Sequence, residues 1–140
     1  MAGLMNRLTP KVLAVRTHGV IDYAHAGLNF AAAALLRNTN RRASKAAFAI
    51  GAGVLANALL TDYPFGVFRV YSFRLHGAVD YGLATTSASV PRLLGIEHLP
   101  EARFFKLQST AEALVAALTD YKDESVSPRR RSFSSRRALR

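Results

Sequence analysis

Two histidines and two aspartates recur at the same spacing in two parts of the chain. His18 and Asp22 are four residues apart, and so are His76 and Asp80. A separation of four places both side chains on one face of a helix. Imidazole and carboxylate groups bind metals, exchange protons and pair with cations. The spacing therefore indicates a metal or proton site, or a network of ion pairs.

The two His/Asp pairs belong to a tandem duplication of the sequence. Residues 16–23, RTHGVIDY, align with residues 74–81, RLHGAVDY, and the segment LTDY at 60–63 recurs at 118–121. Two polar strings that repeat at one common offset indicate a duplicated structural unit. We predict two copies of one helical hairpin, at about residues 10–63 and 72–121.

Helix signals divide each copy into two helices. Thr9-Pro10 is a helix start, and Ser44 and Ser72 can cap the helices that follow them. Pro91 ends or kinks the third helix, and Leu99-Pro100 starts the fourth. The sequence therefore predicts an all-α fold, a four-helix bundle with helices at about residues 10–36, 44–62, 72–90 and 100–121.

The distribution of charge favours a membrane protein over a nucleic-acid-binding one. The net charge is +10, but the basic residues gather in one loop around residues 37–45 and in the segment 122–140. Basic residues at the ends of apolar segments are typical of membrane proteins beside lipid headgroups. The absence of cysteine excludes disulfides and thiolate chemistry.

The apolar segments support the same interpretation. The second segment is apolar nearly all round, and Ala47 and Gly51 are small residues four apart, a spacing that lets membrane helices approach closely. We predict a transmembrane bundle in residues 1–121, followed by a basic disordered tail at 122–140. The expected partners are the lipid bilayer, anionic headgroups bound by the tail, and a second copy of the chain.

The count of basic residues predicts the orientation in a bacterial plasma membrane. Twelve basic residues lie on the side of the two termini and seven on the other. Because loops rich in Lys and Arg stay inside, the termini are expected in the cytoplasm.

The motifs resemble those of a known family. The series His-Gly-x-x-Asp-Tyr at 18–23, Leu-Thr-Asp-Tyr-Pro-x-Gly at 60–66 and Arg-x-His-x-x-x-Asp at 74–80 is similar to that of the small bacterial SPW-repeat membrane proteins. The resemblance covers roughly residues 14–121 and implies paired transmembrane hairpins without an assigned activity. At the place of the motif that gives this family its name, the chain has Pro91 and Gly95 but lacks the Trp.

The hairpin arrangement predicts which polar groups meet. Antiparallel packing brings Asp62 to the level of His18 and Asp22, and Asp120 to that of His76 and Asp80. Arg16 and Arg74 recur at the same helix starts. One hypothesis is a structural network in which these Arg, His and Asp side chains lock the hairpins.

The alternative hypothesis is a metal site. A pair of His and four Asp side chains matches the ligand set of dinuclear centres in helix bundles, with Fe, Zn or Mn as candidate metals. The candidate ligands are His18, Asp22, Asp62, His76, Asp80 and Asp120. His25 could add a ligand in the first unit, and a small-ligand or headgroup site is a third alternative.

The leading functional hypothesis is a small membrane protein with a structural or accessory role, rather than an enzyme. A membrane-embedded metal-binding protein or oxidoreductase is the second. A soluble bundle whose tail binds nucleic acid is the third. Gln108, Glu112 and Asn57 are expected to form hydrogen bonds between helices.

Overall fold

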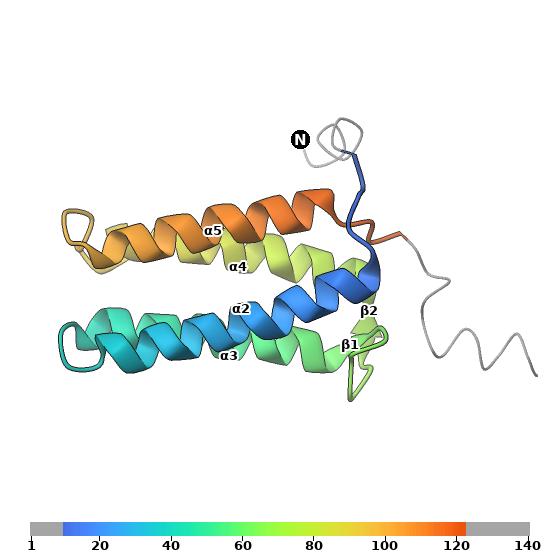
Figure 1. The fold of residues 1–140 in the computed structure, drawn as a ribbon, viewed down its shortest axis with the longest axis horizontal. Coiled ribbons are helices and arrows are strands. Elements are labelled where there is room, and N and C mark those ends of the chain that lie inside the picture. The colour runs from blue at the N-terminus through green and yellow to red at the C-terminus, as the bar shows by residue number, and fades with distance from the viewer. Residues whose placement is uncertain (1–9, 123–140) are drawn as a thin grey trace, which may run out of the picture.

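Two helical hairpins lie side by side in the computed structural model, which describes residues 10–122 (Figure 1). Helices α2 (Val15–Leu36) and α3 (Arg41–Leu60) form the first hairpin, and α4 (Phe73–Leu93) and α5 (Glu101–Leu118) form the second. The prediction of an all-α, four-helix fold is confirmed. The predicted tail lies outside the described residues, apart from Lys122.

The first hairpin begins differently from the prediction. α2 starts at Val15 and not near Pro10, because the chain before it is extended and Leu13 forms a bridge with Thr119. α3 starts earlier than predicted, because the Asn40 side chain accepts a 3.0 Å hydrogen bond from the amide of Ala43. Ser44, the predicted cap, instead donates a 2.7 Å hydrogen bond to the carbonyl of Ala33 in α2.

The second hairpin follows the prediction more closely. Ser72 caps α4 by accepting a hydrogen bond from the amide of Leu75. Pro91 does not end this helix, which continues to Leu93. α5 begins directly after Pro100, as predicted.

The ends of α3 and α5 also differ from the predicted boundaries. Each helix stops at the Leu of the repeated LTDY segment, at Leu60 and Leu118, and the next residue is extended. Strand β1 (Thr61–Asp62) then pairs in parallel with β2 (Tyr71–Ser72). Side chains alternate in direction along an extended chain. This alternation decides which residues of LTDY face the interior.

Apolar side chains fill the half of the bundle nearest the two hairpin loops. The buried residues of this core are Ala26, Ala33, Ala43, Ala47, Ile50, Val54, Val90, Ile96 and Phe105. Gly51 permits the close approach of α2 and α3, because a Cβ at this position would lie 2.9 Å from the Cβ of Asn29. The other half holds a second buried apolar cluster, Val15, Ala58, Tyr63 and Phe73, together with buried polar groups.

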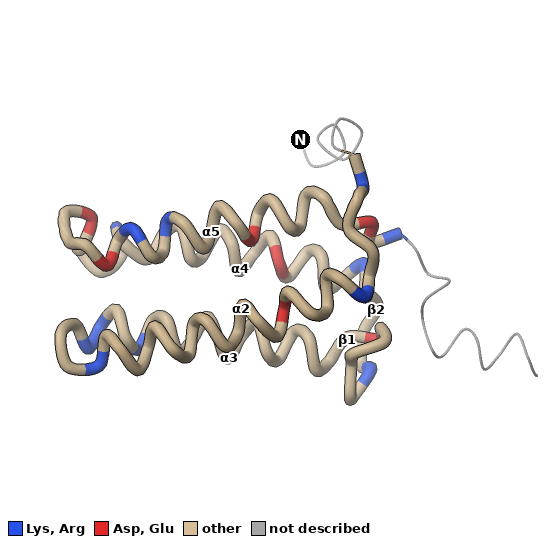
Figure 2. Tube along the Cα trace, viewed as in Figure 1, with Lys and Arg blue, Asp and Glu red and all other residues tan. Residues whose placement is uncertain are grey.

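The outer surface carries large apolar side chains. Lys and Arg gather near the two ends of the helices (Figure 2). Val20, Leu35, Phe48, Leu107 and Leu114 are among the exposed apolar residues. Within the described residues, α3 is the one helix that is long and apolar enough to cross a membrane. One such helix is weak support for a transmembrane fold, so the membrane location stays a prediction.

Candidate metal centre

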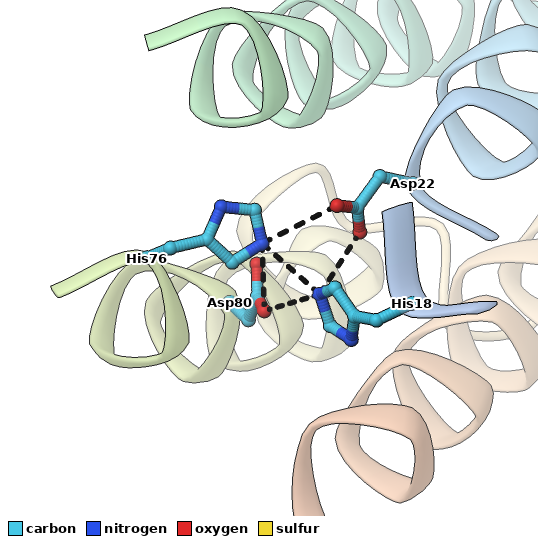
Figure 3. Close-up of side chains that lie close together, drawn as sticks. All are labelled: His18, Asp22, His76 and Asp80. Carbon is cyan, nitrogen blue, oxygen red and sulfur yellow. Dashed lines mark hydrogen bonds and ion pairs between the residues drawn. The ribbon is translucent and has the colours of Figure 1, made fainter. Parts of the chain in front are cut away.

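Four buried side chains converge between the two hairpins, near the starts of α2 and α4 (Figure 3). α2 contributes His18 and Asp22, and α4 contributes His76 and Asp80. Their exposed fractions are 1%, 6%, 0% and 7% in that order. Each residue offers one ligand atom, and these atoms all lie within 4.8 Å of one another. We call this group the His/Asp cluster.

The cluster has nearly two-fold symmetric distances. His18 Nε2 lies 3.2 Å from Asp22 Oδ1 and 3.2 Å from Asp80 Oδ2. His76 Nε2 lies 3.3 Å from Asp22 Oδ2 and 3.3 Å from Asp80 Oδ2. The two Nε2 atoms are 3.0 Å apart. Each histidine therefore contacts a carboxylate of its own helix and one of the other hairpin.

The outer nitrogen of each histidine is held by a threonine from the opposite hairpin. His18 Nδ1 is 2.8 Å from Thr119 Oγ1, and His76 Nδ1 is 2.7 Å from Thr61 Oγ1. Both hydroxyls also bond to a backbone carbonyl one turn earlier, Thr61 to Asn57 and Thr119 to Val115. Each hairpin therefore supplies a threonine that holds the histidine of the other hairpin.

The threonine contacts assign the protons of the imidazole rings. A hydroxyl has one proton, and a carbonyl can only accept, so each threonine donates to its carbonyl. It must then accept from the ring, which places a proton on Nδ1 of both histidines. In the neutral rings, both Nε2 atoms therefore present lone pairs to the cluster.

Two tyrosines complete the repeated arrangement. Tyr63 donates a 3.3 Å hydrogen bond to Asp22 Oδ2, and Tyr121 donates a 2.6 Å hydrogen bond to Asp80 Oδ2. Gly77 allows the second contact, because a Cβ there would lie 2.7 Å from the Tyr121 ring. At Gly19 a Cβ would lie 2.6 Å from the Phe65 ring and 2.9 Å from the Tyr63 ring. The Gly of the repeated His-Gly motif thus makes room for the Tyr of LTDY.

One support of the cluster has no counterpart in the other repeat. Asn57 of α3 donates a 2.8 Å hydrogen bond from Nδ2 to Asp80 Oδ1, and Tyr71 donates to Asn57 Oδ1. Since Asn57 bonds to Asp80 of α4, the prediction that it links helices is confirmed. Its equivalent in α5 is Val115, which cannot donate a side-chain hydrogen bond.

The electrostatics of the metal-free cluster favour protonated histidines and ionised aspartates. Burial favours a neutral imidazole, but hydrogen bonds and charge from Asp22 and Asp80 outweigh it and raise the pKa of His76 to about 9. The same opposing causes raise the pKa of His18. Burial also opposes the ionised carboxylates, yet the two histidines lower the pKa values of Asp22 and Asp80.

Four of the six predicted ligands meet, and Asp62 and Asp120 do not join them. In the extended segments after α3 and α5, Thr and Tyr face the interior and the Asp between them faces the other way. Asp62 and Asp120 are half-buried, and Asp120 Oδ1 accepts a 3.0 Å hydrogen bond from the amide of Lys122. The structure therefore does not bring these two predicted carboxylates into the cluster.

The other predicted members also lie outside the cluster. Arg16 and Arg74 are exposed, and the ion pairs of the cluster join histidine to aspartate only. His25 lies about two turns further along α2 and is half-buried, with its Nε2 3.2 Å from Gln108 Oε1. The sequence did not predict that the repeated Thr and Tyr of LTDY surround the cluster, although their repetition was the signal for it: Thr61, Tyr63, Thr119 and Tyr121.

Comparisons with known proteins add no further assignment. No protein-family model, no curated protein and no solved structure matches this chain. The resemblance to the SPW-repeat proteins therefore stays a prediction, and the function is argued from the site.

Proposed function

We propose that the chain binds one divalent transition-metal ion in the His/Asp cluster, and that this ion locks the two hairpins together. The observation that carries the proposal is the set of acceptors in the cluster. Two imidazole lone pairs and the oxygens of two carboxylates converge within 4.8 Å. While both imidazoles are neutral, no donor lies between the two Nε2 atoms and the carboxylate oxygens that face them, so a cation is required there, either a metal ion or protons on the imidazoles.

Charge balance favours a metal ion over protons. One divalent ion neutralises Asp22 and Asp80 completely and leaves both imidazoles in the neutral form that binds metals. Two protons also balance the charge, but they place two N–H groups against each other across the 3.0 Å between His18 Nε2 and His76 Nε2. A single proton leaves a net negative charge in a buried site, which is costly.

The spacing of the atoms supports a tetrahedral ion. Around an ion with bonds of about 2.0 Å, tetrahedral ligand atoms are separated by about 3.3 Å. Asp80 Oδ2 lies 3.2 Å and 3.3 Å from the two Nε2 atoms, which are 3.0 Å apart, and Asp22 approaches the same atoms with both of its oxygens. Among Fe, Zn and Mn, zinc prefers four ligands in this geometry, so Zn²⁺ is the best match.

The partners of the histidines also fit a metal site. Metal-binding histidines usually donate their second N–H to a neighbouring acceptor, which fixes the orientation of the ring. Thr61 and Thr119 take that role. Because each hairpin supplies one His and one Asp, removing the ion would leave two half-sites that attract each other less.

The second candidate is the same cluster without metal, acting as a network of ion pairs between the hairpins. The observation in its favour is the four His–Asp ion pairs. In this alternative both histidines are protonated and the role is structural only.

Metal analysis of the purified protein separates the two candidates. We expect about one zinc per chain by mass spectrometry, and metal loss in His76→Ala. His25→Ala is the matched control and should keep its metal, since His25 bonds to Gln108 and lies outside the cluster. Less than about one tenth of an equivalent of Fe, Zn or Mn, even after incubation with zinc at pH 8, would overturn the proposal.

A further inference from the structure

The two sides of the bundle are packed differently. α3 lies against α4, whereas α2 and α5 are not among the closely packed pairs of helices. In Figure 1, α2 and α5 are the two helices nearest the viewer. A cavity of about 270 Å³ lies on this side, and residues of all four helices line it. We call this cavity the α2–α5 cleft.

The α2–α5 cleft has apolar walls and reaches the His/Asp cluster. Ile21, Leu28, Val54 and Val115 are among its lining residues. His18, Asp22 and Asp80 also line it. An apolar pocket with a few converging polar groups is the usual form of a small-molecule site.

Three polar residues of the cleft, outside the His/Asp cluster, stand at positions where the two repeats differ. Gln108 and Glu112 of α5 stand at the positions that Ile50 and Val54 occupy in α3. His25 of α2 likewise corresponds to Leu83 of α4. The other repeat therefore shows that the fold accommodates aliphatic residues at equivalent positions, so polar groups in the cleft are not a general requirement of the hairpin.

Two of these side chains have buried atoms without a hydrogen-bond partner. Gln108 is 5% exposed and Glu112 is 8% exposed. Within the described residues, neither Gln108 Nε2 nor Glu112 Oε2 has a hydrogen-bond partner. His25 Nε2 contacts Gln108 Oε1 and so fixes the orientation of the amide. An unsatisfied buried polar atom is destabilising, and a bound ligand can supply what it lacks.

We infer that the α2–α5 cleft binds a small uncharged molecule with an apolar body and a polar end that both accepts and donates hydrogen bonds, such as a primary amide or an alcohol. The polar end accepts from Gln108 Nε2 and bonds to Glu112 Oε2. The apolar body lies against the aliphatic walls. A charged ligand is disfavoured because these apolar walls cannot solvate an ion.

The size of the cleft sets the scale of the ligand. A cavity of about 150 Å³ lined by apolar side chains is enough for benzene. The cleft, at about 270 Å³, accommodates a benzene ring with a polar substituent. The binding groups are Gln108 and Glu112 and not the metal ligands, so this inference does not depend on metal loading.

Three probes of similar size test the inference by calorimetric titration: benzamide, benzoate and cumene. They carry an amide, a carboxylate and an apolar isopropyl group on the same ring. We expect benzamide to saturate one site per chain and to bind at least about tenfold more tightly than the other two. Equal binding of cumene, or no saturation by benzamide, would overturn the inference.

Matched variants take their residues from the other repeat. Gln108→Ile combined with Glu112→Val copies Ile50 and Val54, and should weaken benzamide binding at least about tenfold while improving that of cumene. Thr110→Ile, on the exposed side of the same helix, is the control and should bind benzamide as the wild type does. Unchanged benzamide binding in the double variant counts against the cleft.

Metal content measured in the same samples separates the two proposals. Zinc at about one equivalent without benzamide binding rejects the cleft and leaves the metal centre. Benzamide binding without metal rejects the metal centre and leaves the cleft. The helical content of each variant is measured by circular dichroism, and the three-probe comparison on the wild type remains decisive if a variant fails to fold.

Discussion

The His/Asp cluster and the α2–α5 cleft are neighbouring regions in which the two repeats behave in opposite ways. In the cluster, each of His18, Asp22 and Thr61 has an identical counterpart 58 residues further along the chain. In the cleft, His25 corresponds to Leu83, and Glu112 corresponds to Val54. The cluster lies between α2 and α4, the first helix of each hairpin, and both copies contribute to it equally. The cleft lies only on the α2–α5 side of the bundle.

The difference indicates which residues each region needs. A site between two equivalent helices is complete only when both copies supply their groups. A site on one side of the bundle needs polar groups from one copy alone, and the other side can pack with Ile50 and Val54, which belong to the aliphatic core. The cluster residues are therefore the same in the two repeats, whereas the polar residues specific to the cleft occur in only one of them.

The strongest test of this comparison removes one histidine from each repeat. We expect His18→Ala and His76→Ala to lose bound metal and to lower the free energy of unfolding by about 4 kcal/mol each, because two buried carboxylates are left without enough positive charge. Thermal unfolding and metal analysis measure both effects. His98→Ala is the control, since His98 is exposed in the loop between α4 and α5. A large effect in only one of the two histidine variants would contradict the symmetric site.

The dependence of stability on pH distinguishes a metal-free cluster from a loaded one. In metal-free protein the pKa of His76 is raised from 6.5 to about 9 by its carboxylate partners. A raised folded-state pKa contributes stability that is fully present below pH 6.5 and is lost as the pH rises through about 9. The loss for this group is about 3 kcal/mol. Asp22 and Asp80 act in the opposite sense, and their contribution is lost as the pH falls below about 4.

Bound zinc should counteract the loss of stability that the metal-free protein shows as the pH rises. Protons compete with the metal for the imidazoles, so metal binding strengthens as the pH rises. We expect the difference in melting temperature between zinc-loaded and chelator-treated protein to widen from pH 6 to pH 9. A difference that stays constant over this range would indicate that the histidines do not bind the metal.

The sequence predicted the helical hairpins and the four central side chains, because both depend on short-range spacing. A separation of four places His76 and Asp80 on one helix face wherever the helix lies. The duplication then brings the two pairs together by symmetry. The caps were less predictable: Asn40 precedes Ser44, and which of them starts α3 depends on the loop that joins it to α2.

The threonines and tyrosines that bond to the cluster could not be predicted without the exact end of each helix. Had α3 continued through Asp62, the carboxylate could have lain at the level of His18. The chain instead becomes extended after Leu60, and alternation turns Thr61 and Tyr63 inward. The pairing of β1 with β2 stabilises this change, and it involves residues that no local pattern identifies as strand.

The tyrosines give the smallest effect and the finest test of the symmetry. Tyr121 donates to Asp80 at 2.6 Å and Tyr63 donates to Asp22 at 3.3 Å. Short hydrogen bonds to a charged group contribute most, so we expect Tyr121→Phe to cost about 2 kcal/mol and Tyr63→Phe to cost about 0.5 kcal/mol. Thermal unfolding of the two variants measures the difference, and Tyr81→Phe, whose side chain is exposed, is the control. Equal costs would show that the two tyrosines support their carboxylates equally. The symmetry of the cluster would then include the tyrosines as well.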